Sequence, residues 1–136
     1  MNAYSGEIDM NRVLVVDGNV FFRRSFREIL KVYLPGVTMD EAADAEEAFR
    51  RIHSRCPDII FMDIRPNGKS GLELCKEIKA TYPEVVVCVF TDYDLPEYRR
   101  IAYQYGVDHF LQKDALSGAE IAGLITFTLS EKASGF

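Results

Sequence analysis

The sequence predicts an α/β fold in which helices cover both faces of a doubly wound, five-stranded parallel sheet. Short apolar runs alternate with segments of helical periodicity five times along the chain. The clearest runs are continuously apolar, which is typical of strands that are buried on both faces. Helix-capping residues lie between the runs and the periodic segments. Strict alternation of this kind favours parallel strands joined by right-handed crossovers.

The apolar runs predict the strands. Four are clear, and a fifth, weaker candidate follows a Pro-Gly pair that is typical of a turn. The predicted strands cover residues 13–16, 59–62, 85–90 and 110–111, with 37–39 as the weaker candidate.

Between these runs, apolar residues at helical spacing predict five helices. The inward faces are predicted to comprise Phe22, Phe26, Ile29, Leu30 and Tyr33; then Ala45, Ala48, Phe49 and Ile52; then Leu74 and Ile78; and in the last helix Ile121, Leu124, Ile125, Thr128 and Leu129. Four helix starts are predicted from a capping residue three positions before a glutamate: Asp44 with Glu47, Ser70 with Glu73, Asp94 with Glu97, and Ser117 with Glu120. Pro96 suits a first helical turn.

Composition excludes several classes of protein. The chain has 136 residues, of which 48% are apolar, and a net charge of −5. This length predicts one domain, and the apolar content excludes a disordered chain. No apolar stretch is long enough to span a membrane, and the acidic balance argues against direct contact with nucleic acid.

The cysteines and the first residues bear on localisation. The first ten residues do not resemble a secretory signal. Cys56, Cys75 and Cys88 form no close pair, and His53 and His109 do not supply the spacing of a zinc site. We interpret the cysteines as inert buried thiols and expect the protein in a reducing cytoplasm.

Polar residues follow the predicted strands at the point where each one ends. Asp17, Asp63, Thr91 and Lys113 come after the first, third, fourth and fifth strands. The carboxyl ends of parallel strands meet at one edge of the sheet, and open α/β sheets bind their ligands there. Each residue alone is explained by the chain leaving the sheet, but the four together predict a functional site.

The segments VLVVDGN, DIIFMDIRPNGKSGLEL, VVVCVFTDYD and DHFLQKDA resemble the receiver domain of bacterial two-component response regulators. The spacing from Asp63 to Gly71 also matches that family. The resemblance implies a flavodoxin-like sheet of order 2-1-3-4-5. It predicts a receiver domain over residues 11–132, with tails at 1–10 and 133–136.

The resemblance also implies a role for each residue of the predicted site. Asp63 corresponds to the phosphoacceptor, which takes a phosphoryl group from a sensor histidine kinase or a phosphotransfer protein. Lys113 corresponds to the lysine that contacts the phosphoryl oxygens, Thr91 to the switch hydroxyl, and Phe110 to the aromatic residue that repacks with it. A receiver of this kind uses Mg²⁺ and is a signalling module rather than an enzyme.

Two departures from the family lie at the metal site. Gly18 stands in place of the second acid after the first strand, so the remaining ligands implied are Asp17, Asp63 and the backbone carbonyl of Arg65. Asp92 stands beside the switch threonine where the family has a small residue. It either supplies the carboxylate that Gly18 lacks, repels the phosphoryl group, or is a solvated loop acid. Because Mg²⁺ accepts few protein ligands and several waters, the sequence predicts weakened metal binding.

Further departures follow the phosphoacceptor and the lysine. Pro66 comes one position earlier than in most receivers, and Lys113 precedes Asp114 instead of proline. The second change resembles the subgroup of receivers whose outputs are helix-turn-helix DNA-binding domains.

The sequence excludes some alternative functions and leaves one open. A phosphatase with an aspartate nucleophile would need a second acid where Arg65 stands, and no dinucleotide or P-loop motif occurs. A receiver-like interaction module that is never phosphorylated remains the open alternative.

Either module needs a partner surface, and interfaces are enriched in aromatic residues and arginine. We expect docking or homodimerisation through the last two helices, at Tyr98, Tyr103, Tyr105 and the outward-pointing Phe127.

Overall fold

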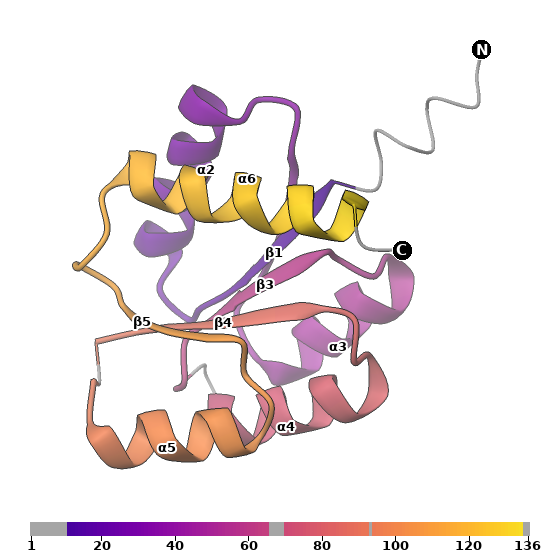
Figure 1. Cartoon of the computed structure of the whole chain (residues 1–136), viewed down its shortest axis with the longest axis vertical. Coiled ribbons are helices and arrows are strands. Elements are labelled where there is room, and N and C mark those ends of the chain that lie inside the picture. Colours follow the sequence, from indigo (N-terminus) through magenta and orange to yellow (C-terminus); the bar gives the residue numbers. More distant parts are fainter. Residues whose placement is uncertain (1–10, 66–69, 93, 135–136) are drawn as a thin grey trace.

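The computed structural model describes residues 11–65, 70–92 and 94–134. Strands and helices alternate along this part of the chain (Figure 1). The strands are β1 (Arg12–Val16), β2 (Thr38–Ala42), β3 (Ile59–Met62), β4 (Val86–Thr91) and β5 (His109–Gln112). The helices are α2 (Val20–Tyr33), α3 (Ala45–Ser54), α4 (Gly71–Thr81), α5 (Pro96–Gln104) and α6 (Gly118–Ser134).

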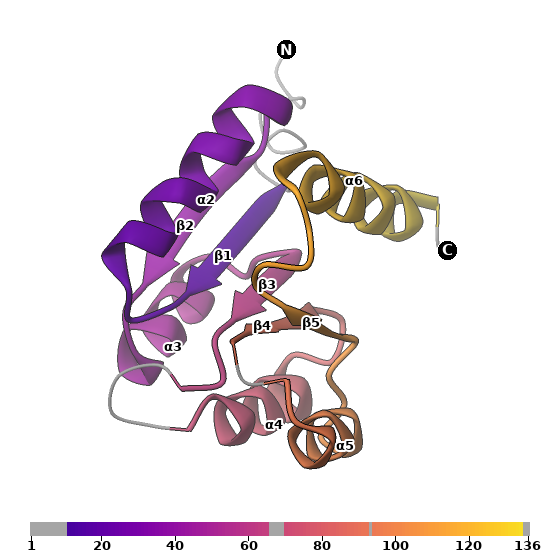
Figure 2. The ribbon, with the colours of Figure 1, turned by 90° about the vertical axis from the view of Figure 1, so that its left-hand side faces the viewer.

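All strand pairs are parallel, and the strand order is β2-β1-β3-β4-β5. Helices α2 and α6 cover one face of the sheet, while α3, α4 and α5 cover the other (Figure 2). The predicted fold class and the order 2-1-3-4-5 are therefore confirmed.

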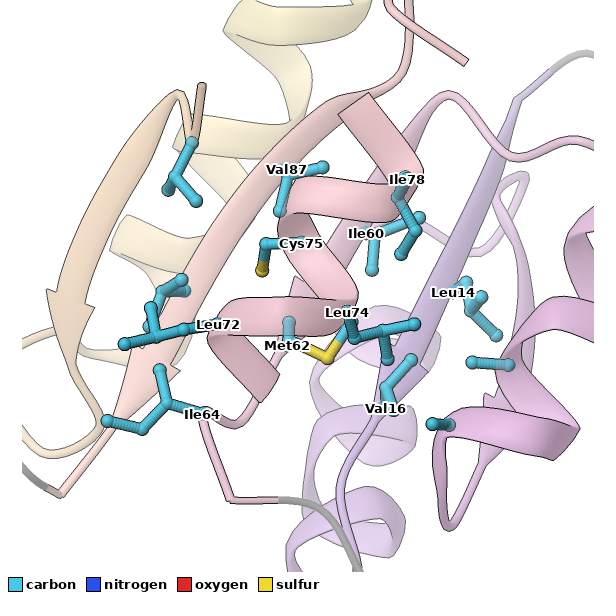
Figure 3. Packing of buried hydrophobic residues seen from close by; sticks show 14 of the residues in the cluster. Leu14, Val16, Ile60, Met62, Ile64, Leu72, Leu74, Cys75, Ile78 and Val87 are labelled. Atoms are coloured by element: carbon cyan, nitrogen blue, oxygen red, sulfur yellow. The ribbon is translucent and has the colours of Figure 1, made fainter. Parts of the chain in front are cut away.

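Each face of the sheet has its own apolar core, because successive strand residues point to opposite faces. On one face, Leu14, Val16, Ile60 and Met62 pack beneath α3 and α4 (Figure 3). On the other face, an aromatic group joins the sheet to α2. Phe26 of that helix lies 4.9 Å from the ring of Phe61, measured between centroids.

The strand register brings the predicted site together. Val16 is paired with Met62, so Asp17 and Asp63 follow neighbouring positions of adjacent strands. Thr91, the last residue of β4, is paired with Gln112, and Lys113 comes next. The four strand-end positions therefore lie along one edge of the sheet.

Several local predictions were wrong. Strand β2 begins at Thr38 and extends to Ala42 instead of covering residues 37–39. Its sequence TMDEA buries two side chains, Met39 and Ala42. Tyr33 lies at the end of α2 and is 49% exposed, so it is not part of the inward face. Cys56 is exposed, in contrast to the buried Cys75 and Cys88.

The predicted helix caps had mixed outcomes. Asp44 accepts from the Glu47 N–H, and Ser117 and Glu120 form a reciprocal capping box. Ser70 precedes α4 but makes no capping hydrogen bond through its side chain. Asp94 is not a cap, because Leu95 occupies the N-cap position of α5. The residue before a proline favours extended angles, which an N-cap also adopts, so Pro96 sets this boundary.

Helix length and hydropathy also bear on membrane insertion. Within the described ranges, no helix combines the length and apolar content needed to span a bilayer.

Candidate functional site

Asp17 is fixed by the turn that leads from β1 into α2. Its N–H donates to the Ala42 carbonyl oxygen at 3.0 Å, and its Oδ1 accepts from the Asn19 N–H at 2.8 Å. The Asn19 side chain in turn caps α2 by accepting from the N–H groups of Phe21 and Phe22. The cap therefore orients the carboxylate, which is almost completely buried. This N-cap was not identified from the sequence, although asparagine at this place is a recognised helix start.

Two arginines of α2 connect this turn to β2. Arg23 donates through Nη1 to the Asp17 carbonyl oxygen at 2.6 Å and through Nε to Glu41 at 2.8 Å. Arg27 binds the second carboxylate oxygen of Glu41 at 2.6 Å. Burial opposes ionisation of Glu41, but hydrogen bonds from Arg27 and Arg23 outweigh it and hold the pKa of this carboxyl below its ordinary value. The backbone of Asp17 is thereby tied to β2.

Asp63 follows β3, and its N–H donates to the Val16 carbonyl oxygen at 2.9 Å. The carboxylate is 15% exposed, so it lies near the surface without being freely solvated. Burial raises the pKa of Asp63, and the negative charges of Asp17 and Asp92 add to this effect. The Lys113 charge and the Arg65 N–H act in the opposite direction without cancelling it. The site thus disfavours a free negative charge on Asp63.

Lys113 provides the positive charge of the site. Its backbone N–H donates to the Thr91 carbonyl oxygen at 2.9 Å, which carries the β4–β5 pairing one residue past the strand. Its Nζ lies 2.6 Å from Asp17 Oδ2 and 3.9 Å from Asp63 Oδ2. The Nζ also lies 4.2 Å from the centroid of the Phe22 ring. The ammonium is therefore paired with Asp17 more closely than with Asp63.

Thr91 and Phe110 lie on neighbouring strands and are almost completely buried. Arg99 of α5 covers Phe110, with its guanidinium carbon 4.8 Å from the ring centroid and Nη1 donating to the Phe110 carbonyl oxygen at 3.2 Å. Asp94 holds the same guanidinium at 2.7 Å. Arg99 thus joins α5 to β5, the strand that Lys113 follows.

The remaining candidate residues differ in how far their side chains are exposed. Asp92 is exposed, yet its charge acts on Asp63. Arg65 donates through Nη2 to the Tyr98 hydroxyl at 3.1 Å, which links the loop after β3 to α5. Tyr98 and Tyr105 are partly buried against the core, so they are less available than predicted. Tyr103 and Phe127 are exposed, at 47% and 62%.

Other predicted features fall outside the described ranges or lack support there. Pro66 lies outside the described residues. In the part of the chain that the structure describes, no three histidine, cysteine or acidic side chains group as a ready metal site.

The donor set nevertheless suits a weakly held hard cation. Asp17 and Asp63 supply carboxylate oxygens, the donors that Mg²⁺ prefers, and Mg²⁺ sites commonly use one or two carboxylates together with water. The Lys113 ammonium already lies against both carboxylates, which shows that the place between them accepts a positive charge. Gly18 adds no side-chain oxygen.

This geometry agrees with a comparison against known families. Residues 13–124 match the family model described as the response regulator receiver domain. The chain belongs to the response regulator receiver domain family. A receiver domain is a signalling module of two-component systems rather than an enzyme, and it implies a cognate histidine kinase.

Receiver domains of known structure share the fold. A CheY-like receiver domain protein from Methanospirillum hungatei JF-1 superimposes with a TM-score of 0.85 at 21% identity, covering 93% of this chain and 99% of that one. A response regulator from Burkholderia pseudomallei, solved with a phosphorylated aspartic acid, a calcium ion and citrate, gives a TM-score of 0.75 at 24% identity. That alignment covers 90% of this receiver domain and 71% of the other chain.

Curated relatives are longer than this chain. The oxygen regulatory protein NreC of Staphylococcus carnosus (strain TM300) is 29% identical over 105 residues, which is 76% of this chain and 48% of NreC. The chain therefore spans about half the length of NreC and of similar curated relatives.

Proposed function

We propose that this receiver domain accepts a phosphoryl group on Asp63. The observation that carries the proposal is the position of this carboxylate. It lies at the end of β3, partly exposed, 3.9 Å from a lysine ammonium that pairs more closely with Asp17. The pKa of Asp63 is also raised, mainly by burial, and perturbed pKa values cluster at functional sites.

The donor proposed is a phosphohistidine of a sensor histidine kinase or a phosphotransfer protein. A carboxylate oxygen of Asp63 attacks the phosphorus, a P–O bond forms, and the P–N bond to the histidine breaks. The imidazole leaves with the electron pair of that bond and takes up a proton, while Asp63 becomes an acyl phosphate. The Burkholderia pseudomallei protein with its phosphorylated aspartic acid is a precedent for this modification on the same fold.

The surrounding residues would act on the charge of the transferred group. Lys113 would move from Asp17 toward the phosphoryl oxygens, since its Nζ is already within 3.9 Å of Asp63. We propose Asp17, Asp63 and the Arg65 carbonyl as ligands of a weakly bound Mg²⁺, with Asp92 as a further candidate. When bound, the cation would neutralise charge on the phosphoryl oxygens during transfer.

Phosphorylation would be read through Thr91 and Phe110. The phosphoryl group adds about −1.5 to −2 charges at Asp63, and we propose that the Thr91 hydroxyl moves to bind it. Phe110 lies on the strand beside Thr91 and beneath Arg99. A shift at Thr91 would therefore reach α5 through the Phe110 ring and the guanidinium that covers it.

The competing function is an interaction module that signals without phosphorylation. Gly18 favours it, because it removes a carboxylate from the proposed metal site. The two functions differ in whether Asp63 is modified at all.

We expect the intact mass of the chain to rise by one phosphoryl group after incubation with acetyl phosphate and Mg²⁺. Asp63→Asn should remove the gain completely, because an amide cannot form the acyl phosphate. Asp114→Asn is the matched control, since it removes an exposed carboxylate that the proposed site does not use and leaves Asp63 intact. An equal gain in Asp63→Asn, or no gain in the parent chain, would contradict the proposal and favour the interaction module.

We further propose that the α5–β5–α6 face is a surface for docking or homodimerisation. β5 is one of the two edge strands, with α5 and α6 on opposite faces of the sheet (Figure 2). Tyr103 on α5 and Phe127 on α6 expose their rings. A hollow of about 480 Å³ beside Phe127 is also lined by Val86, His109 and Thr128. The exposed Phe127 ring beside this hollow, together with the exposed Tyr103 ring on α5, favours a protein partner.

We expect Phe127→Ser combined with Tyr103→Ser to weaken self-association, measured by sedimentation with and without beryllofluoride. The physical reason is the loss of two exposed aromatic anchors. Phe21→Ser is the matched control, because Phe21 is also exposed but lies on α2. A parent chain that stays monomeric in both conditions, or a double variant that associates equally well, would place the interface elsewhere.

A further inference from the structure

Besides the two carboxylates, Lys113 has a third neighbour that phosphoryl transfer does not require. The Phe22 ring, in the first turn of α2, lies 4.2 Å from the ammonium nitrogen. Cation–π contacts are stronger when the cation is desolvated than when it is exposed to water. The Lys113 side chain is only 12% exposed, so this contact lies toward the desolvated limit.

The Phe22 ring is itself held in place by the aromatic core. It makes an edge-to-face contact with Phe90 at 5.9 Å and a tilted contact with Phe26 at 6.2 Å, measured between centroids. Phe26 and Phe90 are almost completely buried, and Phe90 immediately precedes Thr91. The ring is therefore a supported surface rather than a freely rotating side chain.

We propose that Phe22 is a positioning residue that holds the Lys113 ammonium on Asp17. This inference rests on the proposed phosphoacceptor site and names a residue that regulates it. Asp17 Oδ1 is occupied by the Asn19 N–H, and the ammonium takes Oδ2 at 2.6 Å. A divalent cation that uses the Asp17 carboxylate must compete with Lys113 for it. The Phe22 ring stabilises the ammonium in this position, so it favours Lys113 over the divalent cation.

The arrangement adds a second cause of weak metal binding beside Gly18. Gly18 withholds an oxygen, whereas Phe22 and Lys113 neutralise an oxygen that is present. The two causes are separable, because Phe22 contributes no possible metal ligand.

The experiment is a titration of the full chain with Mn²⁺ alone, followed by electron paramagnetic resonance and by competition with Mg²⁺. Phe22→Leu should bind Mn²⁺ about 5–30-fold more tightly than the parent chain, the fold-change expected from losing a largely desolvated cation–π contact. Phe22→Tyr should bind like the parent, because it retains the aromatic face. Phe21→Leu is the matched control, since that neighbouring ring faces Arg24 at 5.7 Å instead of Lys113.

A second measurement keeps the test decisive if leucine disturbs the aromatic core. Fluorinated phenylalanine at position 22 keeps the ring in place but weakens its negative face, so Mn²⁺ affinity should rise with each added fluorine. In the parent chain, the Lys113 Hε protons should also show an upfield ring-current shift.

Unchanged Mn²⁺ affinity in both Phe22→Leu and the fluorinated series would overturn the inference, as would an equal gain in Phe21→Leu or an absence of Mn²⁺ binding in every variant. These titrations contain no phosphodonor. Failure of Asp63 to be phosphorylated would therefore leave the Phe22 result interpretable by itself.

Discussion

Replacing Gly71 by alanine is expected to destabilise the domain by about 3 kcal/mol, the upper end of the range for overpacking. A Cβ at this position would overlap the backbone of Asp63 and Ile64, atoms that cannot turn aside as a flexible side chain can. The Gly71 N–H also donates to the Ile64 carbonyl oxygen, so α4 begins in direct contact with the end of β3. Either the helix or the Asp63 backbone must move. The measurement is the midpoint of urea unfolding.

Two other glycines provide matched controls for this prediction. A Cβ at Gly36 or Gly123 meets no heavy atom within 4 Å. Gly123 lies inside α6, where alanine is the better helix former, so Gly123→Ala should raise the unfolding midpoint. A Gly71→Ala variant as stable as the parent would show that the close approach of α4 to β3 is not required.

The fold was predictable wherever burial left a continuous pattern. β1, β3 and β4 have helices on both faces, and their apolar runs therefore gave clear signals. β2 was mispredicted because it is an edge strand in which only Met39 and Ala42 are buried. Asp94 resembled a helix cap by spacing alone, but Pro96 determines where α5 starts, and the Asp94 carboxylate pairs with Arg99 instead.

The candidate site was predictable to the level of strand ends and no further. Parallel strands deliver their carboxyl ends to one edge, and register then places Asp17 beside Asp63. The sequence contains no signal for which carboxylate Lys113 prefers, because that depends on side-chain positions. The contact with Phe22 joins α2 to the end of β5, and Phe22 was assigned only to an apolar helix face. Contacts between segments that are distant in the sequence leave no local pattern from which they could be predicted.

Gly18→Asp is expected to tighten Mg²⁺ binding by about 10–100-fold, the size of effect that changes around a metal site produce. Among the described residues, positive φ occurs at Gly106 and not at Gly18, so backbone strain does not oppose aspartate at position 18. The new carboxylate would lie just before the first turn of α2, where the helix dipole favours negative charge. It would add a hard oxygen beside Asp17 and Asp63, and it would give the Lys113 ammonium an alternative partner. Calorimetric titration with Mg²⁺ measures the change.

Asp92→Ala separates two of the three interpretations of this acid, namely a metal ligand and a solvated loop acid. If Asp92 supplies the carboxylate that Gly18 lacks, then Asp92→Ala should abolish the residual Mg²⁺ binding of the parent chain, and Gly18→Asp should restore it in the double variant. If Asp92 is a solvated loop acid, its loss should change Mg²⁺ affinity little, while the effect of Gly18→Asp remains. Unchanged affinity in Gly18→Asp, with Asp92 present or absent, would contradict the prediction that the missing second acid weakens metal binding. The competition between Lys113 and the cation for the Asp17 carboxylate would then be the main cause of weak Mg²⁺ binding.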